Sequence, residues 1–181
     1  MRIAKLLALA LIVPMMGFGC STTPKNDEKK DELTSEVDST VRALTAADPS
    51  LDSFIKNSYG YAVFPSVKKG GFVVGGSYGR GEVYEQGKMI GWSDITQATF
   101  GAQIGGQEFA EIICFESKNA LDRFVSNKYE PTAQASAVIL KSGAAASAKY
   151  ENGVVVFMHT KTGAMLEASV GGQRFQFAPL R

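Results

Sequence analysis

The spacing of hydrophobic and polar residues changes from a helical to a strand pattern at about residue 59. Before that point, four apolar residues recur at intervals of four, four and three in an otherwise charged segment: Leu33, Val37, Val41 and Leu44. This pattern predicts a surface helix over residues 27–47 with one narrow apolar stripe. A second, short helix is expected next, because Asp48 can cap it and Pro49 suits its first turn.

Beyond that change, runs rich in Val, Ile, Phe and Tyr are separated by turn sequences, which predicts strands. The predicted strands are YGYAVFP, GGFVVGGSYGRGEVYE, ATFGAQIGGQEFAEIICF, NGVVVFMHT and AMLEASVGGQRFQFAP. One helix interrupts them, with Ser117 as its N-cap and an apolar face of Ala120, Leu121, Phe124 and Val125. A further strand is expected over Ala135–Leu140, although the many alanines there also suit a helix.

The order of these elements predicts an α+β fold, with the N-terminal helices first. Because helices and strands do not alternate regularly, we expect a mainly antiparallel sheet with a few packed α-helices. Pairs of glycines recur at Gly70-Gly71, Gly75-Gly76, Gly105-Gly106 and Gly171-Gly172. Glycines inside strands mark bends and close backbone approaches. The sheet should therefore be curled into a partial barrel.

The glycine-rich stretch KKGGFVVGGSYGRGEVYEQGK, from Lys68 to Lys88, first suggests a phosphate-binding loop. It matches neither the dinucleotide-binding fingerprint nor the P-loop. Read by alternation, it predicts a strand with one bulky face and one face that is nearly bare between Gly75 and Gly81. Two interpretations of the bare face stay open: it is packed against by the protein's own helix, or it is a ligand surface.

The N-terminal residues have the layout of an export signal. Two basic residues precede an apolar run that ends in small residues before Cys20, which predicts a signal peptide over residues 1–19. Cys20 stands where bacterial lipoproteins carry their lipid, although Gly17 replaces the usual leucine of that motif, so ordinary cleavage is the alternative. We then expect a polar tether over residues 20–30 and a single domain over 31–181. Ser21 after the cysteine favours the outer membrane, facing the periplasm or the cell surface.

Charge and chemistry exclude several classes of function. Removing Arg2 and Lys5 from the 19 basic residues leaves 17 against 18 acids, so a nucleic-acid partner is not expected. His159 is the only histidine, and Cys114 lies in an apolar run that predicts a buried, inert thiol. We therefore expect no metal site, no cofactor and no catalytic residues, and a protein that is not an enzyme.

Basic residues along the glycine-rich stretch are the better candidates for binding. Lys68, Lys69, Arg80 and Lys88 could hold a lipid phosphate, since each basic group near an anionic membrane contributes about 1 kcal/mol. The alternative for each is a charge that keeps sheet edges from pairing. The stripe from Leu33 to Leu44 is a second candidate for membrane contact.

The ordered blocks AVFPSVKKGGFVVGGSYGRGEVY, GWSD, GAQIGGQ and IICF resemble the SYLF domain, also called the Ysc84-like actin-binding domain. The ending GAMLEASVGGQRF resembles the bacterial branch of that family, and the match covers about Leu51 to Phe177. Ile95 stands where the family commonly has proline. The resemblance implies lipid binding, since eukaryotic members bind phosphoinositides and some bind actin, while bacterial members are typically secreted lipoproteins. Actin is not expected as a partner in the native cell.

These observations predict an exported bacterial lipoprotein that binds anionic, phosphoinositide-type phospholipid head groups at a membrane surface without catalysis. The alternative is a structural protein of the cell envelope that binds a protein partner and uses its lipid only as an anchor.

Overall fold

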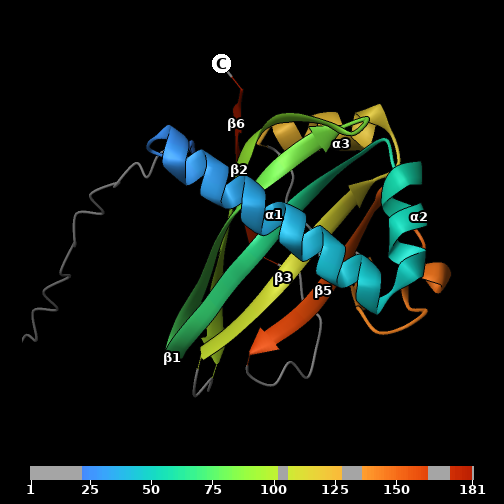
Figure 1. The fold of residues 1–181 in the computed structure, drawn as a ribbon. Helices are drawn as coiled ribbons and strands as arrows, with labels where there is room; N and C mark the ends of the chain where they lie inside the picture. The colour runs from blue at the N-terminus through green and yellow to red at the C-terminus, as the bar shows by residue number, and fades with distance from the viewer. Residues whose placement is uncertain (1–21, 102–105, 128–135, 163–171, 181) are drawn as a thin grey trace, which may run out of the picture.

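The fold is a curled sheet with two helices on one face and one on the other (Figure 1). The computed structural model describes residues 22–101, 106–127, 136–162 and 172–180. In chain order the elements are α1 (Asp27–Ala47), α2 (Pro49–Asn57), β1 (Gly60–Glu85), β2 (Lys88–Gly101), β3 (Gly106–Phe115), α3 (Lys118–Val125), β4 (Ser136–Ile139), a 3-10 turn η1 (Ala145–Ser147), β5 (Val154–Thr162) and β6 (Gln173–Pro179). The sheet order is β4-β5-β3-β1-β2-β6. Only the β4–β5 pair is parallel among the described strands, so the predicted α+β class with a mainly antiparallel sheet is confirmed.

The long strand β1 folds back on itself. Its first arm pairs with β3 from Gly60 to Gly70, and its second arm pairs with β2 from Val73 to Glu85. The arms lie side by side, because the backbone N–H of Gln86 donates to the carbonyl of Tyr59 at 2.9 Å. The chain therefore reverses direction within the glycine-rich stretch itself.

This reversal defines the two ends of the sheet. We call the end where β1 turns, with Gly70, Gly101, Gly106 and Thr162, the tip end. The opposite end, where β1 meets the Gln86-Gly87 turn and where β3 ends and β5 begins, is the base end.

The bare face of the glycine-rich strand is covered along the middle of the second arm by the protein itself. A Cβ on Gly81 would lie 2.2 Å from the carbonyl oxygen of Val63, and one on Gly79 would lie 2.8 Å from that of Ser66. Both approaches come from the first arm of β1, so only glycine fits there. The covering element is a neighbouring strand rather than a helix.

The outer face of the sheet is covered by α1 and α2. The predicted apolar stripe of α1 is used here, because Leu33, Val37 and Leu44 are buried against the sheet with Val155 and Phe157. The hydroxyl of Thr34 also donates to the buried carboxylate of Glu82 at 2.6 Å. The interpretation of this stripe as a membrane-contacting surface is therefore wrong for the folded domain, because the protein's own core already buries it.

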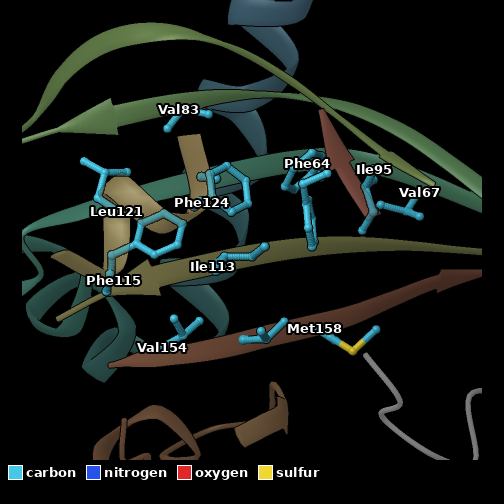
Figure 2. Close-up of a cluster of buried hydrophobic side chains, with 14 of the residues drawn as sticks. Phe64, Val67, Val83, Ile95, Ile113, Phe115, Leu121, Phe124, Val154 and Met158 are labelled. Carbon is cyan, nitrogen blue, oxygen red and sulfur yellow. The ribbon is translucent and has the colours of Figure 1, made fainter. Parts of the chain in front are cut away.

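The inner face is filled by α3 and by large apolar side chains that point toward one another (Figure 2). Phe124 of α3 lies 4.9 Å from Phe115 and 5.0 Å from Phe175, measured between ring centroids. Burying a large apolar side chain of this kind contributes about 1.5–3 kcal/mol. Since Phe175 belongs to β6 and Phe115 to β3, α3 ties together two strands that are not neighbours in the sheet.

The predicted helix starts are confirmed by their caps. The side chain of Asp48 accepts a hydrogen bond from the backbone N–H of Ser50, with Pro49 as the first residue of α2. Ser117 accepts from the backbone N–H of Ala120 at the start of α3. The short strand expected over Ala135–Leu140 is present as β4.

Two predicted boundaries are wrong. Residues 88–97 form most of β2, although no strand was predicted there. The run predicted as one strand from Ala98 to Phe115 belongs to two, since β2 ends at Gly101 and β3 begins at Gly106. The helix α1 spans Asp27–Ala47, as its hydrophobic spacing predicted, and it therefore overlaps the last four residues of the expected tether. Residues 163–171, part of the last predicted strand, lie outside the described residues.

Candidate functional site

Two of the four predicted lipid-binding residues lie together at the tip end. Lys68 and Lys69 stand next to the reversal of β1, opposite Glu108 and Gln107 of β3. Lys68 is exposed and Lys69 half-buried. Neither lysine has an ion-pair partner among the residues that the structure describes. Their charges are therefore available to an anion.

Arg80 lies midway along the second arm of β1 and is already ion-paired. Its Nε donates to Oδ1 of Asp94 at 2.8 Å, and its Nη2 lies 3.4 Å from Oδ2 of the same carboxylate. This contact raises the pKa of Arg80 above its ordinary value. Asp94 is buried, so the pair is a cross-strand link in the sheet with little net charge to offer a phosphate.

Lys88 lies at the base end, where it pairs with Glu85 across the turn. It begins the 14-residue strand whose other end, Gly101, is at the tip end. At about 3.3 Å per residue the two ends of β2 are on the order of 40 Å apart along the strand. The four predicted residues therefore do not form one cluster, and only Lys68 and Lys69 share a location.

One further basic residue that the sequence did not single out, Lys161, joins them at the tip end, and another, Arg174, lies nearer the middle of the sheet, opposite Thr96 of β2. Lys161, near the end of β5, lies 4.0 Å from Glu108, the residue that pairs with Lys68. Arg174, near the start of β6, is exposed. Among the described residues, the tip end thus carries Lys68, Lys69 and Lys161 beside the carboxylate of Glu108. The register of β1, β3 and β5 brings Lys68, Lys69 and Lys161 together, so sequence spacing alone could not have found this group.

The inner face between the middle of the sheet and the tip end holds a row of buried polar side chains, which we call the polar belt. It consists of Ser77 on β1, Gln97 on β2, Gln173 on β6 and Glu111 on β3, all of them buried. Ser77 pairs with Gln97, and Gln97 with Gln173, in neighbouring strands. The Nε2 of Gln173 then donates to Oε2 of Glu111 at 2.9 Å, which closes the curl from β6 to β3.

Glu111 is the one acid among the four residues of the polar belt, and its pKa is strongly raised. Its carboxyl is fully buried, and burial raises its pKa to about 7 even though the hydrogen bond from Gln173 lowers it. The second oxygen of Glu111 and the oxygen of Gln173 have no hydrogen-bond partner among the described residues. The sequence carried a signal for this residue, because Glu111 is the one acid among the inward positions Phe109, Ile113 and Phe115.

A cavity of about 590 Å³ adjoins the polar belt at the β2–β6 pair. Among the described residues it is lined by Thr96, Gln97, Ala98, Gly172, Gln173 and Arg174. Its lining thus includes two residues of the polar belt, Gln97 and Gln173, together with Arg174.

A second hollow, of about 340 Å³, lies between the start of α1 and β1. It is lined by Pro24, Lys25, Lys29, Glu32, Leu33, Glu36 and Arg80. Lys29 pairs with Glu32 and Arg80 pairs with Asp94, whereas Lys25 has no ion-pair partner among the described residues; the carboxylates of Glu32 and Glu36 also line the hollow. It offers an anion less than the tip end does.

The remaining sequence candidates are placed as follows. Cys114 is a buried free thiol, as predicted, and burial raises its pKa to about 12, which makes it a poor nucleophile. His159 lies on β5, partly exposed. Across the described part of the chain, no group of His, Cys, Asp and Glu side chains could hold a metal ion, and no helix is long and apolar enough to cross a membrane. Cys20 and the predicted signal lie outside the described residues.

Comparison with known proteins adds one relative. No protein-family model matches this chain. The chain is 28% identical over 150 residues to the Beta cell expansion factor A of Aeromonas veronii. The alignment covers 82% of this chain and 57% of that protein, so this chain matches little more than half the length of its relative.

Proposed function

We propose that this protein binds anionic phospholipid at a membrane surface through the tip end of its sheet, and that an acylated Cys20 tethers it to the outer membrane. The observation that carries the proposal is the grouping of Lys68 and Lys69, which lack acidic ion-pair partners among the described residues, with Lys161. The resemblance to the SYLF domain supports lipid as the ligand.

The expected binding free energies favour a weak contact between the tip end and the membrane that depends on the lipid anchor at Cys20. A basic residue near an anionic surface contributes about 1 kcal/mol, so Lys68 and Lys69 together supply about 2 kcal/mol, and further basic groups add to this. Such an interaction is screened by salt beyond about 8 Å at physiological ionic strength. A lipid on Cys20 would raise the local concentration of the domain at the bilayer, so that a weak head-group contact suffices to orient it.

Vesicle co-sedimentation tests the proposal. The protein carries Cys20→Ser, which removes the acylation site, and the vesicles contain phosphatidylcholine with or without phosphatidylglycerol. We expect binding only to the anionic vesicles, and binding at least about tenfold weaker for the double variant Lys68→Glu/Lys69→Glu, since charge reversal replaces attraction by repulsion.

The double variant Lys88→Glu/Lys149→Glu is the matched control. It changes the net charge by the same amount, but Lys88 lies at the base end, and Lys149 is exposed next to Tyr150, which packs on α2. The control should bind like the parent protein. Equal weakening of both double variants would show that net charge alone acts, and absence of binding by the parent would reject the proposal.

A further inference from the structure

Two hydrogen-bond acceptors are left over where β6 meets β3 across the curl. The Nε2 of Gln173 donates to Oε2 of Glu111 at 2.9 Å, while Oε1 of each side chain has no hydrogen-bond partner among the described residues. Both side chains are shut off from solvent, since Gln173 is 1% and Glu111 is 0% exposed. Native proteins rarely leave buried polar atoms without a partner, so two such oxygens on a contacting pair require an explanation.

A proton on Glu111 supplies the missing donor. An ionised carboxylate only accepts hydrogen bonds, and so does the amide oxygen of Gln173, so neither can satisfy the other. A carboxylic acid can instead donate its O–H to an amide oxygen while the amide N–H donates to its second oxygen. Burial acts in the same direction, because it raises the pKa of Glu111 to about 7 against the opposing effect of the bond from Gln173.

The surroundings of Glu111 supply no charge that would favour its ionised form. It lies opposite Phe64 of β1 and Met158 of β5. On the first arm of β1, the charged residue on the inward side is Lys69, which lies opposite Gln107, four positions along β3 from Glu111. The inward side chains that the other described elements contribute near the pair are uncharged: Phe109 and Ile113 on β3, Ile95 and Gln97 on β2, Gln173 and Phe175 on β6, and Phe124 on α3.

This pair holds an edge strand to a strand that is not its neighbour. In the described sheet β6 is hydrogen-bonded to β2, and it reaches the inner face through Gln173 and through Phe175, whose ring lies 5.0 Å from that of Phe124. We propose that Glu111 and Gln173 form a proton-dependent clasp. Protonated Glu111 holds β6 with two hydrogen bonds, and when its proton passes to solvent the O–H donor is lost and this part of β6 loosens.

The clasp is independent of membrane binding, because Lys68, Lys69 and Lys161 take no part in it. Infrared difference spectroscopy tests for the proton. The spectrum of Glu111→Gln is subtracted from that of the parent protein at about pH 6, where exposed carboxyls are already ionised. We expect the carbonyl band of a protonated carboxylic acid in the parent protein, and its loss as the pH rises well above 7. The matched control Glu151→Gln removes an exposed acid and should leave that band in place.

Amide hydrogen exchange tests the loosening. After correction for the intrinsic effect of pH, the backbone N–H groups of β6 should exchange at least about tenfold faster once the acid is ionised, since local opening becomes easier. In Glu111→Gln they should show no such change, because the side-chain amide of the variant donates to Gln173 at every pH.

Absence of the acid band from the parent protein at about pH 6 would overturn the proposal, and an ionised Glu111 linked to Gln173 by a buried water would give that result. Unchanged exchange of β6 after the band is lost would overturn it as well. Should Glu111→Gln fail to fold, the band and the exchange rates of the parent protein, followed as the pH rises from about 6, still decide between these outcomes.

Discussion

The base end and the tip end of the sheet are built from the same strands, yet they differ in how tightly they are packed. At the base end, α3 fills the inner face with Leu121 and Phe124, and the two arms of β1 touch through glycines. At the tip end, a polar belt and a cavity adjoin the interior, and a Cβ on Gly70 would have no neighbour within 4 Å. The base end is therefore the more tightly packed of the two, and the tip end is the part for which we propose lipid binding.

Replacing a glycine at each end should produce the largest difference. Gly81→Ala places a methyl group 2.2 Å from the carbonyl oxygen of Val63, so a backbone shift is required and we expect a loss of about 3 kcal/mol or more. Gly70→Ala meets open space and should change stability by less than about 1 kcal/mol. Urea unfolding of both variants measures the difference. Similar losses would contradict the contrast between the ends.

The buried carboxyl of Glu111 should make stability depend on pH. Its pKa is raised from 4.5 to about 7 in the folded protein, so between these values the folded state holds a proton that the unfolded state has released. Stability should therefore fall as pH rises through this window. At about 1.4 kcal/mol for each unit, the penalty reaches about 3 kcal/mol above pH 7.

Glu111→Gln keeps the shape of the side chain but cannot ionise, so it should abolish this pH dependence. Urea unfolding at a series of pH values between 4 and about 8 measures it for both proteins. A parent protein whose stability is flat or rises across this window would show that Glu111 is solvated and that the interior near the tip end is wet.

A buried carboxyl on the outer face, Asp48, should behave in the opposite way. It accepts hydrogen bonds from the backbone N–H groups of Ser50 and Ala145 at 3.1 and 2.8 Å. Burial raises its pKa, but these bonds outweigh burial and hold the pKa below 3.8. Its contribution is therefore complete above pH 3.8 and lost as pH falls through the lowered pKa.

Asp48→Ala should cost about 2 kcal/mol at neutral pH, since a helix cap and a buried N–H partner are both lost. Asp48→Asn, which keeps an acceptor oxygen, should cost less. Thermal unfolding at pH 7 compares the two variants. An equal cost for both would show that the charge of Asp48, rather than its hydrogen bonds, stabilises the outer face.

The sequence predicted the parts of this fold that depend on local chemistry. Asp48 with Pro49 and Ser117 gave correct helix starts, because capping acts within three residues. The strand over residues 88–97 was not predicted, because it contains a glycine and an acid, which are uncommon in strands. Contacts with other strands accommodate both: Asp94 pairs with Arg80, and Gly91 lies close to Ala178.

The candidate site was predicted less well, because its contacts depend on how distant strands pair. Lys68 and Lys69 could be proposed from the sequence, but the pairing of Arg80 with Asp94 depends on the register between β1 and β2. The contact of Gln173 with Glu111 joins residues 62 positions apart on strands that are not neighbours. The curl of the sheet creates that contact, and glycine pairs predict a curl without predicting which residues it brings together.

The most direct test of the central claim, that the tip end meets the membrane, is a comparison of two labels. An environment-sensitive fluorophore is attached to Lys69→Cys or to Lys88→Cys in the Cys20→Ser protein, where buried Cys114 should not react in the folded state. On phosphatidylglycerol vesicles, the label at position 69 should shift its emission to the blue, and the label at position 88 should not. Equal shifts at both positions, or a shift at position 88 alone, would contradict the account.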